Sequence, residues 1–204
     1  MRAPLAAVLA LLACGITVPA NAVMTTVTDT GSSYALSLRV GQVTGTDTVA
    51  FNVAGNNVAI APAPVAGSQS ISIWVTPVRP VSTSAASRPV TLRVDSSSGL
   101  TCQSGGCGST IIPFSKISWT SNGSGTGDIQ NGSFTGSASQ QIASFEANAT
   151  YCSAIIIFGV CFLGTWYYQS NAMNATALSF TYANDTLYPA GLYKGTVYFT
   201  ASME

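Results

Sequence analysis

Apolar and polar residues alternate with a period of two along several short stretches of the chain. The clearest examples are residues 34–40, 70–75, 90–95 and 177–182. Such alternation places one kind of side chain on each face of a pleated strand, so each stretch should have a core side and a solvent side. Weaker patterns predict further strands at residues 48–53, 57–60, 110–119, 133–145 and 196–201.

Turn-forming residues separate these stretches. Clusters of Gly, Asn, Asp, Ser and Pro lie at residues 55–57, 95–99, 121–127, 131–132 and 189–191. Almost no helical period is present. Short strands at this spacing predict an all-β fold, an antiparallel sandwich or barrel. The Ser- and Gly-rich stretch at residues 121–136 is interpreted as a long loop within the domain.

The N-terminus has the layout of a signal peptide. Arg2 precedes an apolar run over residues 4–14, and Ala20 and Ala22 flank a small-residue cleavage site. We therefore expect residues 1–22 to be removed on export and residues 23–204 to form a single domain. An alternative is a lipoprotein signal in which Cys14 becomes the acylated first residue.

Charged residues are scarce, at 7% of the chain, against about a quarter in typical soluble proteins. The formal net charge is zero. No basic patch is available for nucleic acid, so that class of partner is set aside. A neutral surface rich in hydroxyl groups opposes self-association only weakly, which suits a protein that packs against other copies.

The cysteines predict a disulfide framework. Cys102 and Cys107 bracket four residues, and Cys152 and Cys161 bracket a mostly apolar segment. Proximity favours pairing 102 with 107 and 152 with 161, although four cysteines allow three connectivities. A zinc site with four thiolates is the rival interpretation, disfavoured by the wide second spacing and by export.

The segment between the second cysteine pair is unusually apolar, reading Ala-Ile-Ile-Ile-Phe-Gly-Val-Cys-Phe-Leu over residues 154–163. One interpretation is a strand or hairpin buried on both faces that turns near Gly159. The other is an exposed apolar loop that contacts a membrane or a neighbouring subunit. Its candidate contact residues are Ile155, Ile156, Ile157 and Phe158.

Catalytic groupings are sparse. The chain has no histidine, which removes Ser-His and Cys-His nucleophile pairs and imidazole metal ligands. Two carboxylates among Asp95, Asp128, Glu146 and Asp185 would be required for glycoside hydrolysis, but Asp95 and Asp185 are better explained as turn residues. Ser115 and Lys116 are adjacent, so in a strand they would point to opposite faces. We expect no enzyme, metal or cofactor.

The C-terminal stretch, residues 187–202, resembles the ending of chaperone–usher pilins, especially the spore coat protein U-like type. In both, an Ala-Gly-x-Tyr turn, here residues 190–193, leads into a closing strand of alternating apolar residues. The resemblance implies an incomplete immunoglobulin-like antiparallel β-sandwich that is completed by a strand donated from the next subunit. It also implies other pilus subunits, a periplasmic chaperone and an outer-membrane usher as partners.

Carried onto this chain, the resemblance assigns two sets of residues. The closing-strand residues that face the groove would be Val197, Phe199, Ala201 and Met203. The donated strand would lie in residues 23–33, with Val23, Thr25 and Val27 on one face. The expected function is an exported structural subunit of a surface pilus or fimbria. The alternative is a self-contained secreted β-sandwich that binds a ligand, as an adhesin or glycan-binding module.

Overall fold

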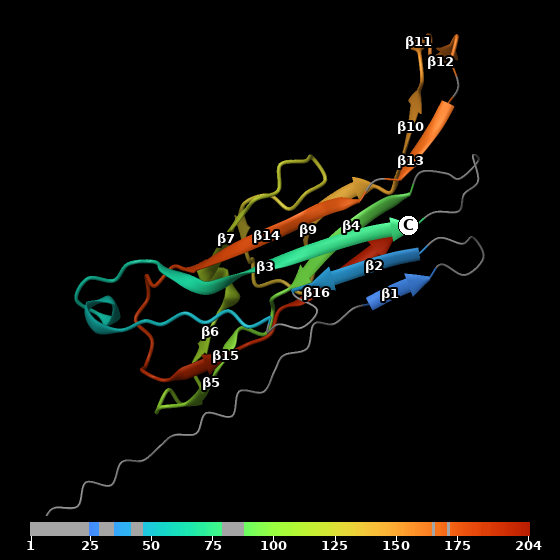
Figure 1. The fold of residues 1–204 in the computed structure, drawn as a ribbon. Helices are drawn as coiled ribbons and strands as arrows, with labels where there is room; N and C mark the ends of the chain where they lie inside the picture. The colour runs from blue at the N-terminus through green and yellow to red at the C-terminus, as the bar shows by residue number, and fades with distance from the viewer. Residues whose placement is uncertain (1–24, 29–34, 42–46, 79–87, 165, 171) are drawn as a thin grey trace, which may run out of the picture.

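The protein folds as an all-β antiparallel sandwich in a computed structural model that describes residues 25–28, 35–41, 47–78, 88–164, 166–170 and 172–204 (Figure 1). The expected leader, residues 1–22, and Val23 lie outside the described residues. The first sheet has the order β1-β2-β3-β14-β7-β8. Its strands are β1 (Thr25–Thr28), β2 (Ala35–Val40), β3 (Val65–Val78), β14 (Met173–Tyr182), β7 (Ile117–Ser121) and β8 (Gly132–Ser133).

The second layer is made of two short sheets that follow one another along the chain. One has the order β16-β4-β9 and the other β15-β5-β6. The chain runs from β4 into β5 and from β15 into β16. Each of these pairs of strands therefore forms one extended run of backbone, called a lane here, that passes through both sheets. Their strands are β16 (Tyr198–Met203), β4 (Pro89–Asp95), β9 (Gln140–Glu146), β15 (Leu192–Lys194), β5 (Leu100–Ser104) and β6 (Ile111–Ile112).

Two further strand pairs extend from the sandwich between β9 and β14. The strands β10 (Asn148–Cys152) and β13 (Trp166–Ser170) form an antiparallel stem. Beyond it, β11 (Ile155–Ile157) and β12 (Val160–Phe162) form a terminal hairpin. Figure 1 shows this hairpin projecting away from the two main layers.

The core lies between the two layers and follows the period-two pattern of the sequence. Ile73 and Val75 of β3 and Val90 and Leu92 of β4 are fully buried. The outward faces carry hydroxyl groups that pair across strands. Ser70 with Ser179, and Thr91 with Ser202, are hydrogen-bonded at 2.8 Å. Alternation therefore predicts which side chains enter the core in these strands.

A side-chain hydrogen bond closes the corner between β14 and β15. The Tyr193 hydroxyl donates a hydrogen bond of 2.7 Å to the carbonyl of Pro189, four residues upstream. Gly191 within this corner packs against the Cys107 sulfur, where a β-carbon would collide.

Four expected strands differ from the structure. Residues 133–145 are divided between the end of β8 and most of β9, and residues 134–139 between them are not in a strand. Residues 57–60 overlap the 3-10 helix η1 (Gly55–Val58), because the Asn56 carbonyl accepts hydrogen bonds from the amides of Ile60 and Ala61 and closes a turn. Residues 110–119 are divided into β6, the 3-10 helix η2 (Phe114–Lys116) and β7, with Pro113 at the break. Residues 48–53 are extended but are not part of a sheet ladder.

Candidate functional site: the free edge of the C-terminal strand

The C-terminal strand β16 is an edge strand among the described residues. It pairs with β4 on one side, in an unbroken antiparallel register from Tyr198–Asp95 to Met203–Val90. No other described strand pairs with it. An edge of this kind presents unpaired N–H and C=O groups that can take up a further strand.

The inward face of β16 is apolar and only partly covered. Phe199, Ala201 and Met203 pack against the core but remain half-buried. Their cross-strand neighbours in β4 are Val94, Leu92 and Val90, and these are at most 1% exposed. Burial therefore falls sharply between β4 and the adjacent strand β16, as expected at the edge of a sheet.

Val197 precedes β16 and is likewise half-buried against the core. It completes the row of four residues that the sequence assigned to the closing strand. The outward residues alternate with this row, and Tyr198, Thr200 and Ser202 are exposed. Three of the assigned residues therefore share one face of β16, and Val197 continues their row just before the strand begins.

The backbone N–H and C=O groups of Phe199, Ala201 and Met203 point to the side of β16 that is not paired with β4. The amide of Glu204 donates to the carbonyl of Pro89 at 3.1 Å, across from β4. Alternate residues of an antiparallel strand bond to the same neighbour, so Ser202 and Thr200 also face β4. The N–H and C=O groups of Ala201, like those of Phe199 and Met203, point away from β4.

A second half-buried apolar row lies on the segment 48–53. Val49, Phe51 and Val53 pack against the core and alternate with exposed residues. The segment continues the lane of β2 along β3, because the Ala50 carbonyl accepts a 2.9 Å hydrogen bond from the amide of Ser68. Its phenyl ring at position 51 lies 6.2 Å from the ring of Tyr182. The segment therefore adds a half-buried apolar row beside β3.

The N-terminal segment assigned as a donor strand forms β1, which is paired with its own β2. The register runs from Thr25 opposite Leu38 to Thr28 opposite Ala35, with Val27 opposite Leu36. Thr25 and Val27 therefore occupy the outer edge of the first sheet. This pairing covers four residues of the chain.

The disulfide between Cys102 and Cys107 lies at the end of β5, next to β15, the strand that precedes β16. Its Cα atoms are 5.7 Å apart, and Cys102 is the register partner of Tyr193 in β15. This confirms the first predicted pairing and rules out a zinc site that needs all four thiolates. Cys161 is also disulfide-bonded. The side chain of Cys152 lies outside the described residues, so the second pairing stays a prediction.

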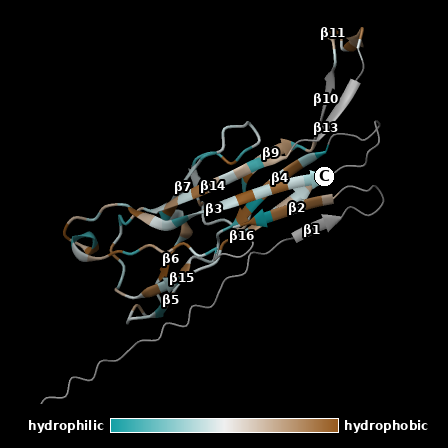
Figure 2. Ribbon diagram, viewed as in Figure 1, coloured by the Kyte–Doolittle hydropathy of each residue, from teal (hydrophilic) through white to brown (hydrophobic). Residues whose placement is uncertain are grey.

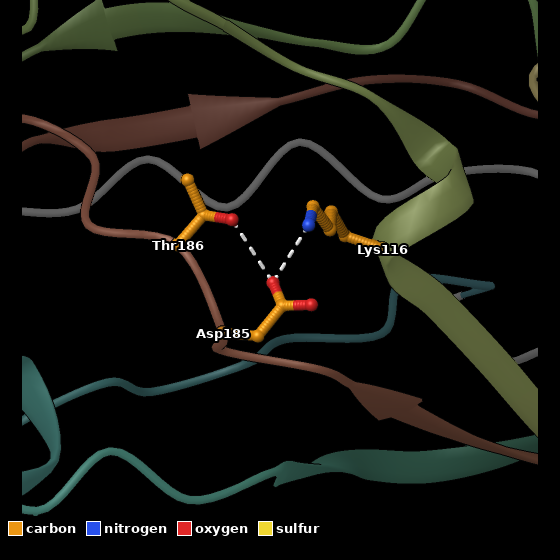
Figure 3. A network of polar contacts seen from close by, with 3 residues as sticks. All are labelled: Lys116, Asp185 and Thr186. Atoms are coloured by element: carbon orange, nitrogen blue, oxygen red, sulfur yellow. Dashed lines mark hydrogen bonds and ion pairs between the residues drawn. The ribbon is translucent and has the colours of Figure 1, made fainter.

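The candidate carboxylates have structural partners. Asp95 accepts hydrogen bonds from the amide and hydroxyl of Ser97, the turn role expected of it. Asp185 lies 2.7 Å from the Lys116 ammonium and accepts a hydrogen bond of 3.0 Å from Thr186 (Figure 3). The hydrogen bond from Lys116 lowers the pKa of Asp185, and Thr186 lowers it further. Lys116 belongs to η2, so the expectation of a strand at Ser115 and Lys116 is wrong.

Asp128 is buried and holds a loop to a strand, a structural role that the sequence did not predict. It is 5% exposed and accepts hydrogen bonds from the amides of Gly125 at 2.8 Å and Asn174 at 3.0 Å, and from the Asn174 side chain at 3.2 Å. Burial acts to raise the pKa of Asp128, but these hydrogen bonds together outweigh it and lower the pKa. The carboxylate fixes the long loop to the start of β14.

The apolar segment turns where the sequence indicated, at Phe158 and Gly159, between the register partners Ile157 and Val160. The interpretation as a hairpin buried on both faces is wrong. Ile155, Ile156 and Ile157 are 63%, 56% and 41% exposed, because the hairpin extends beyond both layers. The alternative of an exposed apolar loop agrees with these values. Val160, Phe162 and Leu163, which the sequence analysis did not single out, are exposed with them.

No protein-family model, curated protein or solved structure matches this chain. Within the described residues, no helix is long and apolar enough to cross a membrane. The same part of the chain contains no group of three His, Cys, Asp or Glu side chains placed to hold a metal ion.

Proposed function

We propose that this protein is an exported structural subunit of a surface pilus or fimbria-like assembly, which polymerises by strand complementation. The observation that carries the proposal is the free edge of β16, where a row of half-buried apolar side chains and a row of unpaired backbone groups belong to the same residues. A strand added at this edge would satisfy the backbone groups and cover the apolar row at once.

The incoming strand would bind by two kinds of contact. Its backbone would pair with Phe199, Ala201 and Met203, which supplies affinity that depends little on sequence. Its alternate side chains would pack against the half-buried apolar row of β16, which sets the register. An inserted apolar side chain there would gain about 25 cal/mol for each Å² of apolar surface removed from water.

Residues 23–33 are the proposed donor. The strand β1 is held by four register pairs to β2, and three of its four residues, Thr25, Thr26 and Thr28, are polar. Releasing this short strand from its own subunit costs few contacts. Val27 and its neighbours would then exchange pairing with β2 for pairing with β16 of the next subunit.

The proposed location is the periplasm and then the cell surface. An N-terminal leader over residues 1–22 and the disulfide between Cys102 and Cys107 both suit export to an oxidising compartment. Other pilus subunits are the proposed permanent partners. A periplasmic chaperone would occupy the edge before assembly, and an outer-membrane usher would direct the exchange. The proposed role is contact without catalysis.

Two complementary variants test this proposal. Ala201→Pro removes an amide donor from the free edge and leaves the pairing with β4 intact, since proline is tolerated at edge positions that face solvent. This variant can donate a strand but cannot accept one. Deleting residues 23–33 behind an intact leader gives the opposite variant, which can accept but cannot donate. Ala201→Gly is the control for the loss of the alanine methyl group.

The expected outcome is a distinct assembly pattern for each chain exported to a bacterial periplasm. Wild type and Ala201→Gly should form ladders on unheated denaturing gels, and each of the two blocked variants should remain a monomer. Mixed together, the two blocked variants should form a heterodimer and nothing longer. Ladders from Ala201→Pro, or a mixture without heterodimers, would contradict the proposal. A wild-type chain that remains a stable monomer would favour the self-contained binding module.

A further inference from the structure

The end of the β11–β12 hairpin is the most exposed apolar surface in the described chain. Figure 1 shows it at the far end of the stem formed by β10 and β13, and Figure 2 shows hydrophobic colour at its end. Phe158 is fully exposed, and Leu163 and Val160 are 86% and 63% exposed. No described core residue covers them. A surface of this kind normally marks a contact site.

The hairpin is apolar on both of its faces, which restricts what it can contact. Ile155 and Ile157 point to one face of β11 and Ile156 to the other, since side chains alternate along a strand. All three are exposed, as are Val160 and Phe162 of the partner strand. A hairpin that docks on the surface of another protein needs one apolar face. A hairpin that is apolar on both faces needs an apolar environment on both sides, such as the acyl chains of a lipid bilayer.

Two of the exposed residues have backbone conformations that their side chains disfavour. Phe158 has a φ of 48° and forms a two-residue turn with Gly159, whose φ is 79°. Asn or Gly is the usual choice at the first position of such a turn. Leu163 has a φ of 59°. Neither residue is favoured by its backbone, and neither is buried, so folding of this chain does not account for their apolar side chains.

The surroundings of the hairpin in the sequence carry no charge. Residues 147–184 contain no Asp, Glu, Lys or Arg. Behind the hairpin, after residues 153–154 on one side and 163–165 on the other, the stem pairs Tyr151 with Tyr167 and Cys152 with Trp166 in register. Trp and Tyr are enriched at the boundary between membrane and water. The order of residue types from the end inward is therefore apolar in the hairpin, then Tyr and Trp in the stem, then polar at Asn148 and Ser170.

The dimensions suit the surface layer of a bilayer. Three strand residues and a turn span about 10 Å at roughly 3.4 Å per residue. Apolar faces of interfacial segments enter the headgroup and acyl boundary by about 5–10 Å. The aromatic positions would then lie near the headgroups.

We propose that the β11–β12 hairpin inserts into the interface of a lipid bilayer and attaches the protein to a membrane surface. Attachment depends on apolar burial and not on the charge of the headgroups, because the segment has no ionisable side chain to attract them. This proposal does not depend on strand complementation, since the hairpin and the edge of β16 are separate structures.

The test compares vesicle flotation of the purified, exported chain with that of two double variants. Phe158→Asn with Leu163→Asn removes both exposed side chains and places a residue that tolerates positive φ at each position. Ile60→Asn with Leu187→Asn is the matched control, because these residues are 83% and 72% exposed elsewhere in the fold. Thermal unfolding of each variant establishes that it is folded. Vesicles are phosphatidylcholine, with and without phosphatidylglycerol.

Wild type and the control variant should float with both kinds of vesicle to the same extent. The hairpin variant should bind at least about tenfold more weakly, since each large apolar side chain contributes about a factor of ten or more to partition. No binding by wild type, equal binding by the hairpin variant, or equal loss in the control would overturn the proposal. Self-association that requires the hairpin, without vesicle binding, would overturn it in favour of a neighbouring subunit.

Discussion

At the scale of single residues, Asp128 shows how a buried charge can hold a loop. Its carboxylate accepts hydrogen bonds from two amides and from one side chain, and the pKa of the group is lowered as a result. A lowered pKa in the folded state means that the folded chain binds this proton more weakly than the unfolded chain. The stability it contributes is present above about pH 4 and is lost as the pH falls through the folded-state pKa.

Asp128→Asn should therefore lower the free energy of unfolding at neutral pH by about 1–3 kcal/mol, because an amide NH₂ would face amide donors. The variant should also lose less stability than wild type when the pH is lowered below about 4. Urea denaturation at several pH values measures both effects. Asp185→Asn, at an exposed ion pair, is the control and should change stability little. Parallel pH curves for wild type and Asp128→Asn would show that this carboxylate is not the titrating group.

Residue-scale chemistry was only partly predictable from the sequence. The turn role of Asp95 follows from its place before three serines and a glycine, and the hydrogen bonds to Ser97 confirm it. Asp128 was considered only as a catalytic candidate, because its partner Asn174 is 46 residues away. Distant partners of this kind leave no local pattern. Gly191 is similar, since its close contact is with Cys107, in the loop that follows β5 and far away in the sequence.

At the scale of elements, the disulfide between Cys102 and Cys107 closes a small loop at the end of β5 and next to β15. In the chain-entropy description, a loop of this length stabilises the fold by about 2 kcal/mol. Cys102→Ala with Cys107→Ala should lower the free energy of unfolding by about that amount and leave the strand content unchanged. Chemical denaturation and circular dichroism test this. An unchanged denaturation midpoint would show that the disulfide does not stabilise the fold measurably and that other contacts hold the loop.

Alternation predicts strands well where one face is buried and the other is wet, as in β3, β4 and β14. It fails at residues 48–53, where the pattern is correct but the segment does not enter a sheet ladder. The alternation pattern also does not predict whether the β11–β12 hairpin is buried or exposed. Three consecutive isoleucines are compatible with burial on both faces and with exposure on both faces, and only the path of the stem decides between them.

At the scale of the whole molecule, hydroxyl pairs take the place that ion pairs have on most protein surfaces. Ser70 with Ser179 and Thr91 with Ser202 join neighbouring strands without charge. Salt screens interactions between ions and leaves neutral hydrogen bonds nearly unaffected. The midpoint of thermal unfolding should therefore shift by no more than about 2 °C between low salt and about 1 M NaCl. Calorimetry measures this shift, and a clear decrease at high salt would reveal electrostatic support that these pairs do not supply.

The pairing of β1 with its own β2 must be broken before the proposed assembly can begin. Because the four residues of β1 are already paired within their own subunit, a newly folded chain begins with its connector folded away. Growth then requires a local opening, followed by capture before the segment closes again. Every addition, the first included, then waits for such an opening, so the rate of growth depends on how often β1 leaves β2 and not only on how often subunits collide.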